Sequence, residues 1–258
     1  MSLVYAPEGL VGVLTPQANT TVEPEMYRLC PPGVALLTAR MTSEAPSLEE
    51  RLRAYYQQLP RWIAEFANAP LGVVASACTG ASYLIGAEAE DALFAQLSQD
   101  FGMPVTNSAL AVIAAMQALG AHRLALVSPY PEWLTAHSRA YWENRGLAVR
   151  QVVQLSSDAG AFHPIYALQG DAAVQGIAGV SAEVDAVLLL GTGLPTLPAL
   201  AQRPRSAGGQ PVLSCNLVLM WHALELMQGH GAAPRGQILL QLLERGTWRQ
   251  ALAGLQPG

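Results

Sequence analysis

The chain has 258 residues, of which 51% are apolar and 13% are charged. This length and composition predict a globular protein of one large domain or two small ones, with ample residues for a core. Its formal net charge of −5 argues against a nucleic-acid-binding surface. All fourteen basic residues are Arg, so the chemistry of a Walker lysine, a Schiff-base lysine or a lysine general base is excluded.

Cysteine spacing and hydropathy limit the protein further. Three widely separated cysteines, with no Cys-x-x-Cys pair, argue against a disulfide framework or a structural zinc site: Cys30, Cys78 and Cys215. The first eight residues contain no pattern of a signal peptide. Two uncharged windows, 66–87 and 101–121, reach the length of a membrane span, but Pro, Gly and polar residues interrupt both. We therefore expect a soluble cytoplasmic protein with no membrane partner.

Short apolar runs alternate with helical patterns along the chain. Predicted strands or buried apolar runs lie at 9–16, 34–41, 73–77, 104–106, 123–129, 147–155, 185–190 and 211–214. Predicted helices lie at 47–67, 88–99, 108–119, 131–145, 172–180, 215–229 and 237–255, with polar loops at 17–21 and 231–236. Ser47, followed three residues later by Glu50, predicts a capping box at the start of the first helix.

The stretch from Val73 to Ser82 combines an apolar run with the turn Cys78-Thr-Gly. It places a thiol at the carboxyl end of a strand, where ligands bind in open parallel α/β sheets. The N–H groups of residues 79–81 can form an anion-binding nest, in which a thiol ionises below its usual pKa of about 8.5. The alternative is a small buried cysteine that ends a core strand.

Similar short sequence motifs recur along the chain at nearly constant spacing. Pro16 and Pro129 are 113 residues apart (129 − 16), as are Thr79 and Thr192 (192 − 79), and a Pro-Val pair recurs after 107 (211 − 104). The repeat predicts an α/β fold of two pseudo-symmetric halves, each with about four parallel strands. We assign 1–106 and 215–258 to the first half and 107–214 to the second, with a site in the cleft between them.

Several short motifs of the sequence fit one superfamily: Thr15-Pro-Gln-Ala-Asn19-Thr-Thr, Arg40-Met41, Ser76-Ala-Cys78-Thr-Gly, Val127-Ser-Pro-Tyr130, Leu190-Gly-Thr-Gly-Leu-Pro-Thr196 and Pro211-Val-Leu-Ser…Trp221-His-Ala-Leu. Through them nearly the whole chain resembles the aspartate/glutamate racemase superfamily, in its maleate cis–trans isomerase and arylmalonate decarboxylase branch. The resemblance implies an enzyme without cofactor or metal that acts on a small dicarboxylate in the cleft between the halves.

The resemblance also implies roles for individual residues. Cys78 corresponds to the first active-site cysteine of the isomerases, the nucleophile on the substrate double bond. Asn19 and Tyr130 correspond to carboxylate-binding residues. The turn amides of two segments, Thr79-Gly80 and Thr192-Gly193, would form anion-binding pockets.

The chain departs from the superfamily pattern in the second half. Gly191 stands where the second cysteine belongs, and the region 162–165 (Phe-His-Pro-Ile) offers no match for an asparagine of the family. Cys215 starts a helix at a strand end and could supply the missing group, or could be a core residue. His163 could act as an acid, or could be a loop residue without a role.

Four functions remain open at this stage. The leading hypothesis is cysteine-based isomerisation of a dicarboxylate such as maleate, because Asn19, Cys78 and Tyr130 fit that branch best. Arylmalonate-type decarboxylation needs one thiol as a proton donor, and racemase-like chemistry or carboxylate binding without catalysis are further alternatives. Arg40, at a strand end, could bind a carboxylate or form an ion pair at the edge of the cleft. A homo-oligomer is left open.

Overall fold

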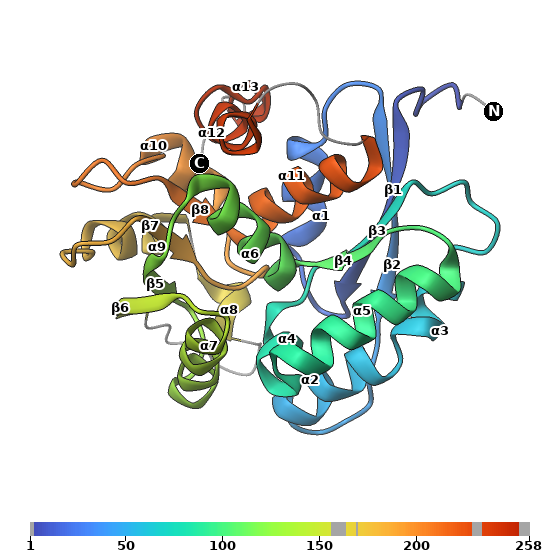
Figure 1. The fold of residues 1–258 in the computed structure, drawn as a ribbon, viewed down its shortest axis with the longest axis horizontal. Helices are drawn as coiled ribbons and strands as arrows, with labels where there is room; N and C mark the ends of the chain where they lie inside the picture. Colours follow the sequence, from blue (N-terminus) through green and yellow to red (C-terminus); the bar gives the residue numbers. More distant parts are fainter. Residues whose placement is uncertain (1–2, 156–163, 169, 229–233, 253–258) are drawn as a thin grey trace.

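Two four-stranded parallel sheets form the centres of two halves that lie side by side (Figure 1). The computed structural model describes residues 3–155, 164–168, 170–228 and 234–252. The first sheet has the order β2-β1-β3-β4, from β1 (Gly9–Pro16), β2 (Val34–Met41), β3 (Val73–Ser76) and β4 (Val105–Asn107). The second has the order β6-β5-β7-β8, from β5 (Arg123–Ser128), β6 (Ala148–Gln154), β7 (Ala186–Leu189) and β8 (Val212–Ser214). The predicted α/β fold of two similar halves is confirmed.

The strand register repeats as the sequence does. Val11 of β1 pairs with Val73 of β3, and 113 residues later Leu124 of β5 pairs with Ala186 of β7 (124 − 11 and 186 − 73). All four strand residues are fully buried. Both faces of such parallel strands are covered by helices, which explains why each strand reads as a continuous apolar run.

Helices connect the strands and cover the sheets. In the first half and the crossover they are α1 (Val22–Leu29), α2 (Leu48–Gln57), α3 (Leu59–Ala64), α4 (Thr79–Ile85), α5 (Ala87–Phe101) and α6 (Ser108–Leu119). The later helices are α7 (Glu132–Asn144), α8 (Pro164–Ala167), α9 (Gly170–Ala178), α10 (Leu197–Gln202), α11 (Cys215–Gln228), α12 (Arg235–Arg245) and α13 (Trp248–Leu252). The predicted loop at 231–236 and the last predicted helical residues fall partly outside the described residues.

The single helix predicted at 47–67 is wrong, because the chain forms two helices, α2 and α3. Gln58 leaves the helical conformation, with φ −108° and ψ 12°, and ends one helix while it begins the next. Pro60 has no N–H to extend the hydrogen-bond ladder of α2, but it fits the first turn of α3. The predicted capping box is confirmed, since Ser47 and Glu50 bond each other's backbone N–H groups.

The C-terminal helices pack across both halves. Helix α11 contacts β3 and α1 of the first half and also α6, while α13 contacts α1 and α10. The division of the chain into a first half of residues 1–106 and 215–258 and a second half of residues 107–214 stays a prediction. No helix in the described ranges is long and apolar enough to cross a membrane; the two uncharged windows contain β3 with α4 and β4 with α6.

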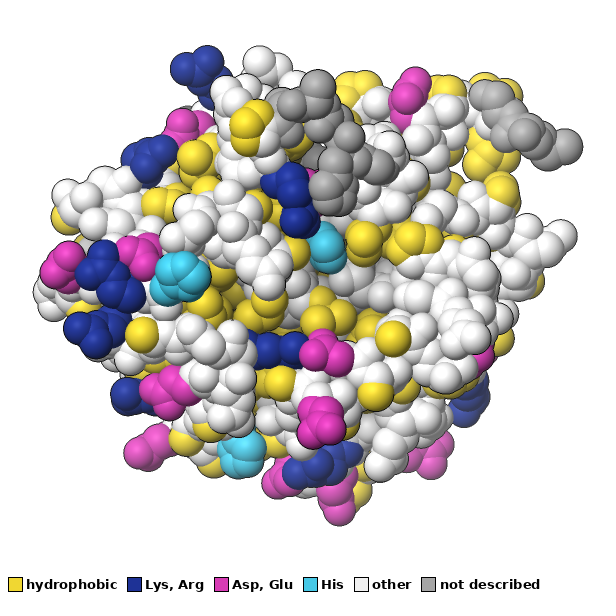
Figure 2. All heavy atoms as spheres, in the orientation of Figure 1, with side chains coloured by type: hydrophobic (Ala, Val, Ile, Leu, Met, Phe, Trp, Pro, Cys, Tyr) yellow, Lys and Arg dark blue, Asp and Glu magenta, His cyan; other side chains and the backbone are white. Residues whose placement is uncertain are grey.

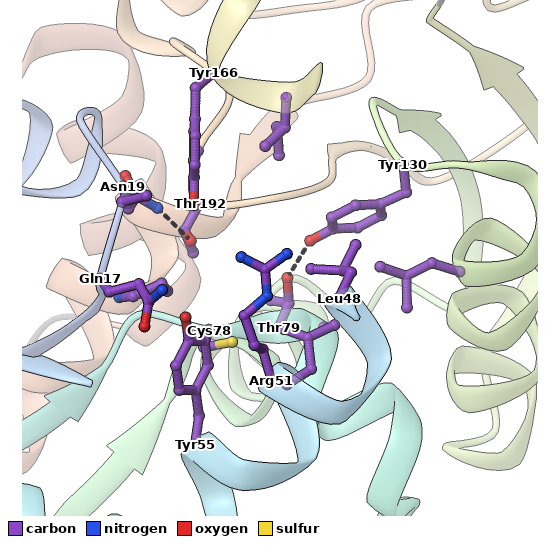
Figure 3. A pocket seen from close by; sticks show the side chains of 17 residues that line it. Gln17, Asn19, Leu48, Arg51, Tyr55, Cys78, Thr79, Tyr130, Tyr166 and Thr192 are labelled. Atoms are coloured by element: carbon purple, nitrogen blue, oxygen red, sulfur yellow. Dashed lines mark hydrogen bonds between the residues drawn. The ribbon is translucent and has the colours of Figure 1, made fainter. Parts of the chain in front are cut away.

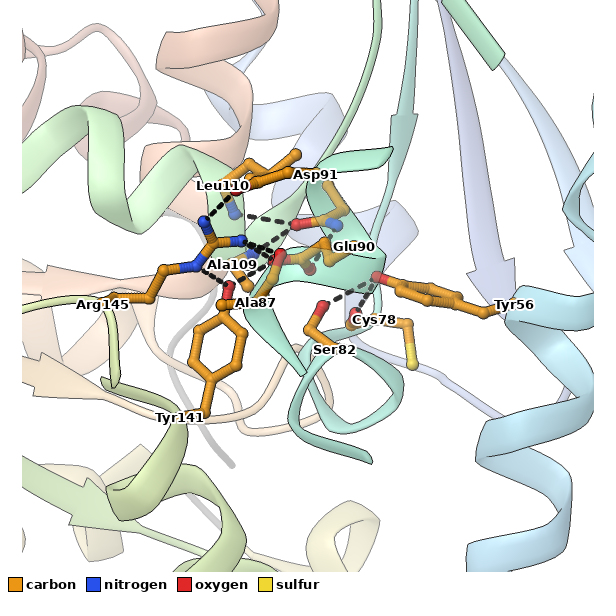
Figure 4. A network of polar contacts seen from close by, with 11 residues as sticks. Tyr56, Cys78, Ser82, Ala87, Glu90, Asp91, Ala109, Leu110, Tyr141 and Arg145 are labelled. Carbon is orange, nitrogen blue, oxygen red and sulfur yellow. Dashed lines mark hydrogen bonds and ion pairs between the residues drawn. The ribbon is translucent and has the colours of Figure 1, made fainter. Parts of the chain in front are cut away.

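A buried ion pair links helix α5 to helix α7 (Figure 4). Glu90 on α5 is 0% exposed and accepts from Arg145, the C-cap residue of α7, at 2.6 Å, from Asn107 at 2.7 Å and from the Tyr141 hydroxyl. Arg145 also contacts Asp91 at 2.7 Å. Because a buried carboxylate needs such partners, this cluster fixes how the two halves meet near α4.

The face shown in Figure 2 carries a hollow with apolar side chains between α5 and α6. Its lining includes Phe94 of α5 and Leu110 and Ile113 of α6, with His222 and Arg235 at its border. It shares no lining residue with the cavity described next.

Candidate active site

A small cavity of about 80 Å³ lies between the halves, at the carboxyl ends of β1, β3, β5 and β7 (Figure 3). This edge of a parallel sheet is where ligands are expected. The lining side chains come from both halves: Pro16, Gln17, Ala18, Asn19, Leu48, Arg51, Leu52, Tyr55, Cys78, Thr79, Gly80, Tyr130, Leu134, Ile165, Tyr166, Thr192 and Gly193. Seven of the eight site residues predicted from the sequence are in this set, and Cys215 is not.

Cys78 lies at the junction of β3 and α4, as the N-cap residue of the helix. Its backbone is extended and its side chain is 3% exposed. The amides of the first turn of α4, Gly80 and Ala81, point at the sulfur, so the nest is the start of a helix rather than a free turn.

The expectation that this nest lowers the thiol pKa is wrong. Burial raises the pKa of Cys78 to about 11, and hydrogen bonds from the N–H groups of Ala81 and Gly80 offset only part of that increase. The cost of removing a thiolate from water exceeds what two amides return. The Cys78 side chain is therefore a neutral thiol at physiological pH.

Helix α2 covers the cavity with one stripe of side chains. Leu48, Arg51, Leu52 and Tyr55 line the cavity, with the spacing i, i+3, i+4, i+7 of a helix face. Leu52 approaches α4 so closely that a Cβ at Gly80 would lie 3.0 Å from its Cδ1 atom. Glycine at position 80 is thus what lets the covering helix sit against the Cys78 loop.

Asn19 connects the two halves across the cavity. Its Nδ2 donates to Thr192 Oγ1 at 3.2 Å, and Thr192 Oγ1 in turn donates to the carbonyl of Ala77, next to the catalytic candidate, at 2.8 Å. Its Oδ1 accepts the N–H groups of Thr21 and Val22 at 2.8 and 2.9 Å. Asn19 therefore forms the Asx turn that starts α1 and also directs its amide N–H₂ group into the cleft.

Arg40 stands outside the cavity and supports the loop that carries Asn19. Its guanidinium donates to the carbonyls of Gln17 and Asn19 at 3.3 and 3.1 Å and forms an ion pair with Glu23. Of the two roles open for Arg40, the structure shows the ion pair at the edge of the cleft.

Tyr130 reaches the cavity from the loop after β5. Its hydroxyl is 2.7 Å from Thr79 Oγ1, which joins the second half to the first turn of α4. Burial raises the pKa of Tyr130 well above its ordinary value. The phenol therefore stays protonated and can donate a hydrogen bond to a ligand oxygen.

Cys215 lies behind this pair rather than in the cavity. It is 0% exposed, and its Sγ lies 3.4 Å from the carbonyl oxygen of Leu189. Burial raises the pKa of this thiol to about 12, and the Gly191 N–H and the Thr79 hydroxyl oppose the increase only in part. His163, the other candidate acid, lies outside the described residues.

Gly191 occupies the position pseudo-symmetric to Cys78, but neither its backbone nor its surroundings suit a thiol. Its φ is +84°, a conformation that side chains with a Cβ rarely adopt. A Cβ there would lie 2.7 Å from Ile165 Cδ1 and 3.2 Å from the Tyr130 hydroxyl oxygen. Ile165 and Tyr130 thus fill the space of a second cysteine.

Four lining residues with polar side-chain groups were not among the predicted site residues: Gln17, Arg51, Tyr55 and Tyr166. Arg51 and Tyr55 lie one turn apart on the same face of α2, so the helical spacing could have indicated that they face the same side. Tyr166 gave no sequence signal; its ring packs where a Cβ of Gly193 would be, 2.5 Å from Tyr166 Cε1.

Within the described residues, no group of three or more His, Cys, Asp and Glu side chains is arranged to hold a metal ion. His222 Nδ1 and Glu225 lie 3.8 Å apart on one face of α11, where Glu225 also pairs with Arg235 at 2.8 Å. This pair belongs to helix packing.

Comparison with known proteins adds to this geometry. Residues 11–240 match the sequence profile of the arylmalonate decarboxylase family. The chain belongs to that family. A curated relative, the maleate isomerase of Geobacillus stearothermophilus, is 28% identical over 255 residues, which cover 89% of this chain and 96% of the relative.

Solved structures of maleate isomerases share the fold of this family member. One is a mutant of the Nocardia farcinica maleate cis–trans isomerase with a covalently bound succinylcysteine intermediate; it has a TM-score of 0.76 at 26% identity, over 90% of this chain and 98% of that one. Another is a mutant maleate isomerase from Pseudomonas putida S16 with maleate, with a TM-score of 0.77 at 25% identity, over 90% of this chain and 97% of that one. The predicted membership in the maleate isomerase and arylmalonate decarboxylase branch, made from short sequence motifs, is confirmed.

Proposed function

We propose that the protein is a cofactor-independent isomerase that converts a small cis-dicarboxylate, maleate or a close analogue, into its trans isomer. The observation that carries the proposal is the Cys78 thiol at one wall of a small cavity whose hydrogen-bond donors come from both halves. The succinylcysteine in the Nocardia farcinica relative supports a thiol as the nucleophile.

The reaction begins when Cys78 Sγ attacks one alkene carbon. A C–S bond forms, and the π electrons move through the other alkene carbon into its carboxylate, giving an enediolate. The thiol proton moves to an oxygen of that enediolate, since the resting thiol is neutral. The Asn19 amide and the Tyr130 hydroxyl stabilise the charge that develops on the carboxylate oxygens.

Rotation and reversal complete the cycle. The bond between the two central carbons is now single and rotates by half a turn. The enediolate electrons re-form the double bond, the C–S bond breaks and the proton returns to the Cys78 sulfur, which releases the trans product. Because the proton shuttles between sulfur and oxygen on one side, this route needs one thiol and tolerates Gly191.

Decarboxylation of a disubstituted malonate is the second candidate. It is favoured by the raised pKa of Cys78, because a neutral thiol can protonate the enediolate left after CO₂ departs. A two-thiol racemisation fits less well, since Gly191 and its neighbours leave no room for an opposing cysteine.

Incubation with maleate and, separately, with phenylmalonate, followed by proton NMR, tests the proposal. Fumarate is the expected product, and Cys78→Ala should abolish its formation. Cys30→Ser is the matched control, because Cys30 lies outside the cavity and should leave the rate unchanged. A monoacid from phenylmalonate alone would establish decarboxylation instead, and conversion of neither compound, with binding retained, would indicate a carboxylate-binding protein.

We also propose that the enzyme works in the cytoplasm. Its three cysteines are unpaired, which suits a reducing compartment. Fractionation of the cells that make it would test this location.

A further inference from the structure

The cavity has an unbalanced charge. Of the described residues that line it, Arg51 alone carries a formal charge at neutral pH, and no Asp or Glu is among them. Burial keeps the Cys78 thiol and the Tyr130 phenol neutral, with raised pKa values. The described lining side chains therefore contribute one positive charge and no negative charge.

Arg51 is placed to use that charge inside the cavity. Its Nε donates to the Ser47 carbonyl one turn earlier at 3.3 Å, which holds the stem along α2. Figure 3 shows the guanidinium extending from α2 into the space bordered by Cys78, Tyr130 and Tyr166. The two terminal nitrogens are thus directed at the volume that a ligand would fill.

The effect of this charge reaches two phenols of the cavity wall. Burial raises the pKa of Tyr55 to about 12, and the positive charge of Arg51 opposes that increase. Arg51 likewise opposes the increase in the pKa of Tyr166, which burial also causes. The charge of Arg51 therefore acts on phenols of the cavity wall.

Two other arginines near the cavity form ion pairs with glutamates. Arg40 pairs with Glu23 at the edge of the cleft, and Arg53, two residues along α2, pairs with Glu49 at 2.9 Å and donates to the Leu84 carbonyl at 3.1 Å. Among the ion pairs of the described residues, Arg51 takes part in none. An arginine that faces a cleft without a carboxylate partner is suited to an anionic ligand.

We propose that Arg51 binds one of the two carboxylates of the substrate, and so makes this site specific for dianions. The identity of that substrate as a cis-dicarboxylate rests on the proposed function. Two carboxylates cannot enter a small, largely apolar cavity without compensation, because an unpaired buried charge is costly. Neutral donors hold one carboxylate, and the planar guanidinium can hold the other through two parallel hydrogen bonds.

The same charge bears on which reaction the cavity favours. A guanidinium beside a carboxylate stabilises it as an anion and opposes its loss as CO₂. Decarboxylation needs the reverse, an apolar contact with the carboxylate that leaves. Arg51 therefore favours a reaction in which both carboxylates are kept.

Binding measurements can test the proposal without turnover. Succinate has two carboxylates and no double bond, and butyrate has the same chain length with one carboxylate. Titration calorimetry would compare both ligands on the wild type, Arg51→Gln, Arg51→Lys and the matched control Arg53→Gln, with circular dichroism to verify that each variant is folded.

The wild type should bind succinate more tightly than butyrate. Because a charge-assisted pair is lost, Arg51→Gln should weaken succinate binding by about 10- to 100-fold and change butyrate binding by less than about threefold. Arg51→Lys should recover part of the succinate affinity, and Arg53→Gln should match the wild type.

Three results would overturn the proposal: equal binding of the two ligands to the wild type, unchanged succinate binding in Arg51→Gln, or an equal loss for both ligands in that variant. The last result would mean that Arg51 supports the shape of the cavity but does not bind the second carboxylate of the ligand. These outcomes are independent of the reaction. If maleate is not isomerised but succinate binding depends on Arg51, the proposed function fails and the dianion site stands. If maleate is isomerised but succinate binding does not depend on Arg51, the proposed function stands and only the role of Arg51 is refuted.

Discussion

The pKa of Cys78 can be tested directly, because the N–H groups at the start of α4 lower it and burial raises it. The thiol of an unstructured chain ionises at about pH 8.5, whereas burial raises the pKa of Cys78 to about 11. A difference of more than about two pKa units corresponds to about 3 kcal/mol and to a thiolate population more than about 100-fold smaller at pH 8. The folded protein should therefore be slow to alkylate at neutral pH.

The assay is the rate of iodoacetamide labelling between pH 6 and 12, measured by mass spectrometry on the peptide that contains Cys78. Labelling should rise with pH and level off only near 11, because the thiolate is the reactive form. The same peptide in urea is the control and should level off near the ordinary thiol value. Since limited access lowers every rate by the same factor, the midpoint in pH reports ionisation separately from burial.

A midpoint at or below about pH 9 in the folded protein would refute this reasoning. It would mean that the N–H groups of Gly80 and Ala81 outweigh desolvation, and that Cys78 rests as a thiolate ready to attack. The route through a neutral thiol, in which the sulfur proton moves to the enediolate, would then be wrong, and decarboxylation with Cys78 as proton donor would lose its support.

Two further variants test the packing around the site. Gly191→Cys should destabilise the protein by about 1–3 kcal/mol in urea unfolding, because a residue with a Cβ is strained at φ +84° and would contact Ile165. Gly191→Cys should cost less in an Ile165→Ala background than in the wild type, because the steric contact is gone while the backbone strain remains. A Gly191→Cys variant as stable as the wild type would contradict the geometry. Arg145→Met should cost about 3–5 kcal/mol, because it leaves Glu90 charged and buried without its cation. Adding Glu90→Gln should restore much of the stability; equal stability of Arg145→Met and the wild type would show that the pair does not hold the halves together.

Much of the fold could be predicted from the sequence because its signals are local. The predicted strands at 9–16 and 34–41 have the bounds of β1 and β2, and the helix at 108–119 has those of α6. Apolar runs bounded by Gly, Pro or polar residues mark such elements without reference to distant parts of the chain. The 113-residue repeat likewise implied equivalent strand pairing in both halves.

Short helices could not be predicted in the same way. Helix α1 has eight residues and α10 has six, too few for a helical period to stand out from a loop. Helix α4 begins directly after Cys78, where the Thr-Gly pair favours a turn. These elements form because tertiary packing stabilises segments that have little helical preference of their own.

The sequence by itself determined which groups surround the cavity: a thiol and small residues at the end of β3, an asparagine after β1 and a tyrosine after β5. Parallel strands bring their carboxyl ends to one edge, so that convergence follows from the order of the elements. The tertiary structure alone decided how those groups behave. It set the direction of the Cys78 pKa, filled the space beside Gly191 with Ile165, and turned Arg51 inward, because desolvation and steric contact depend on neighbours distant in the chain.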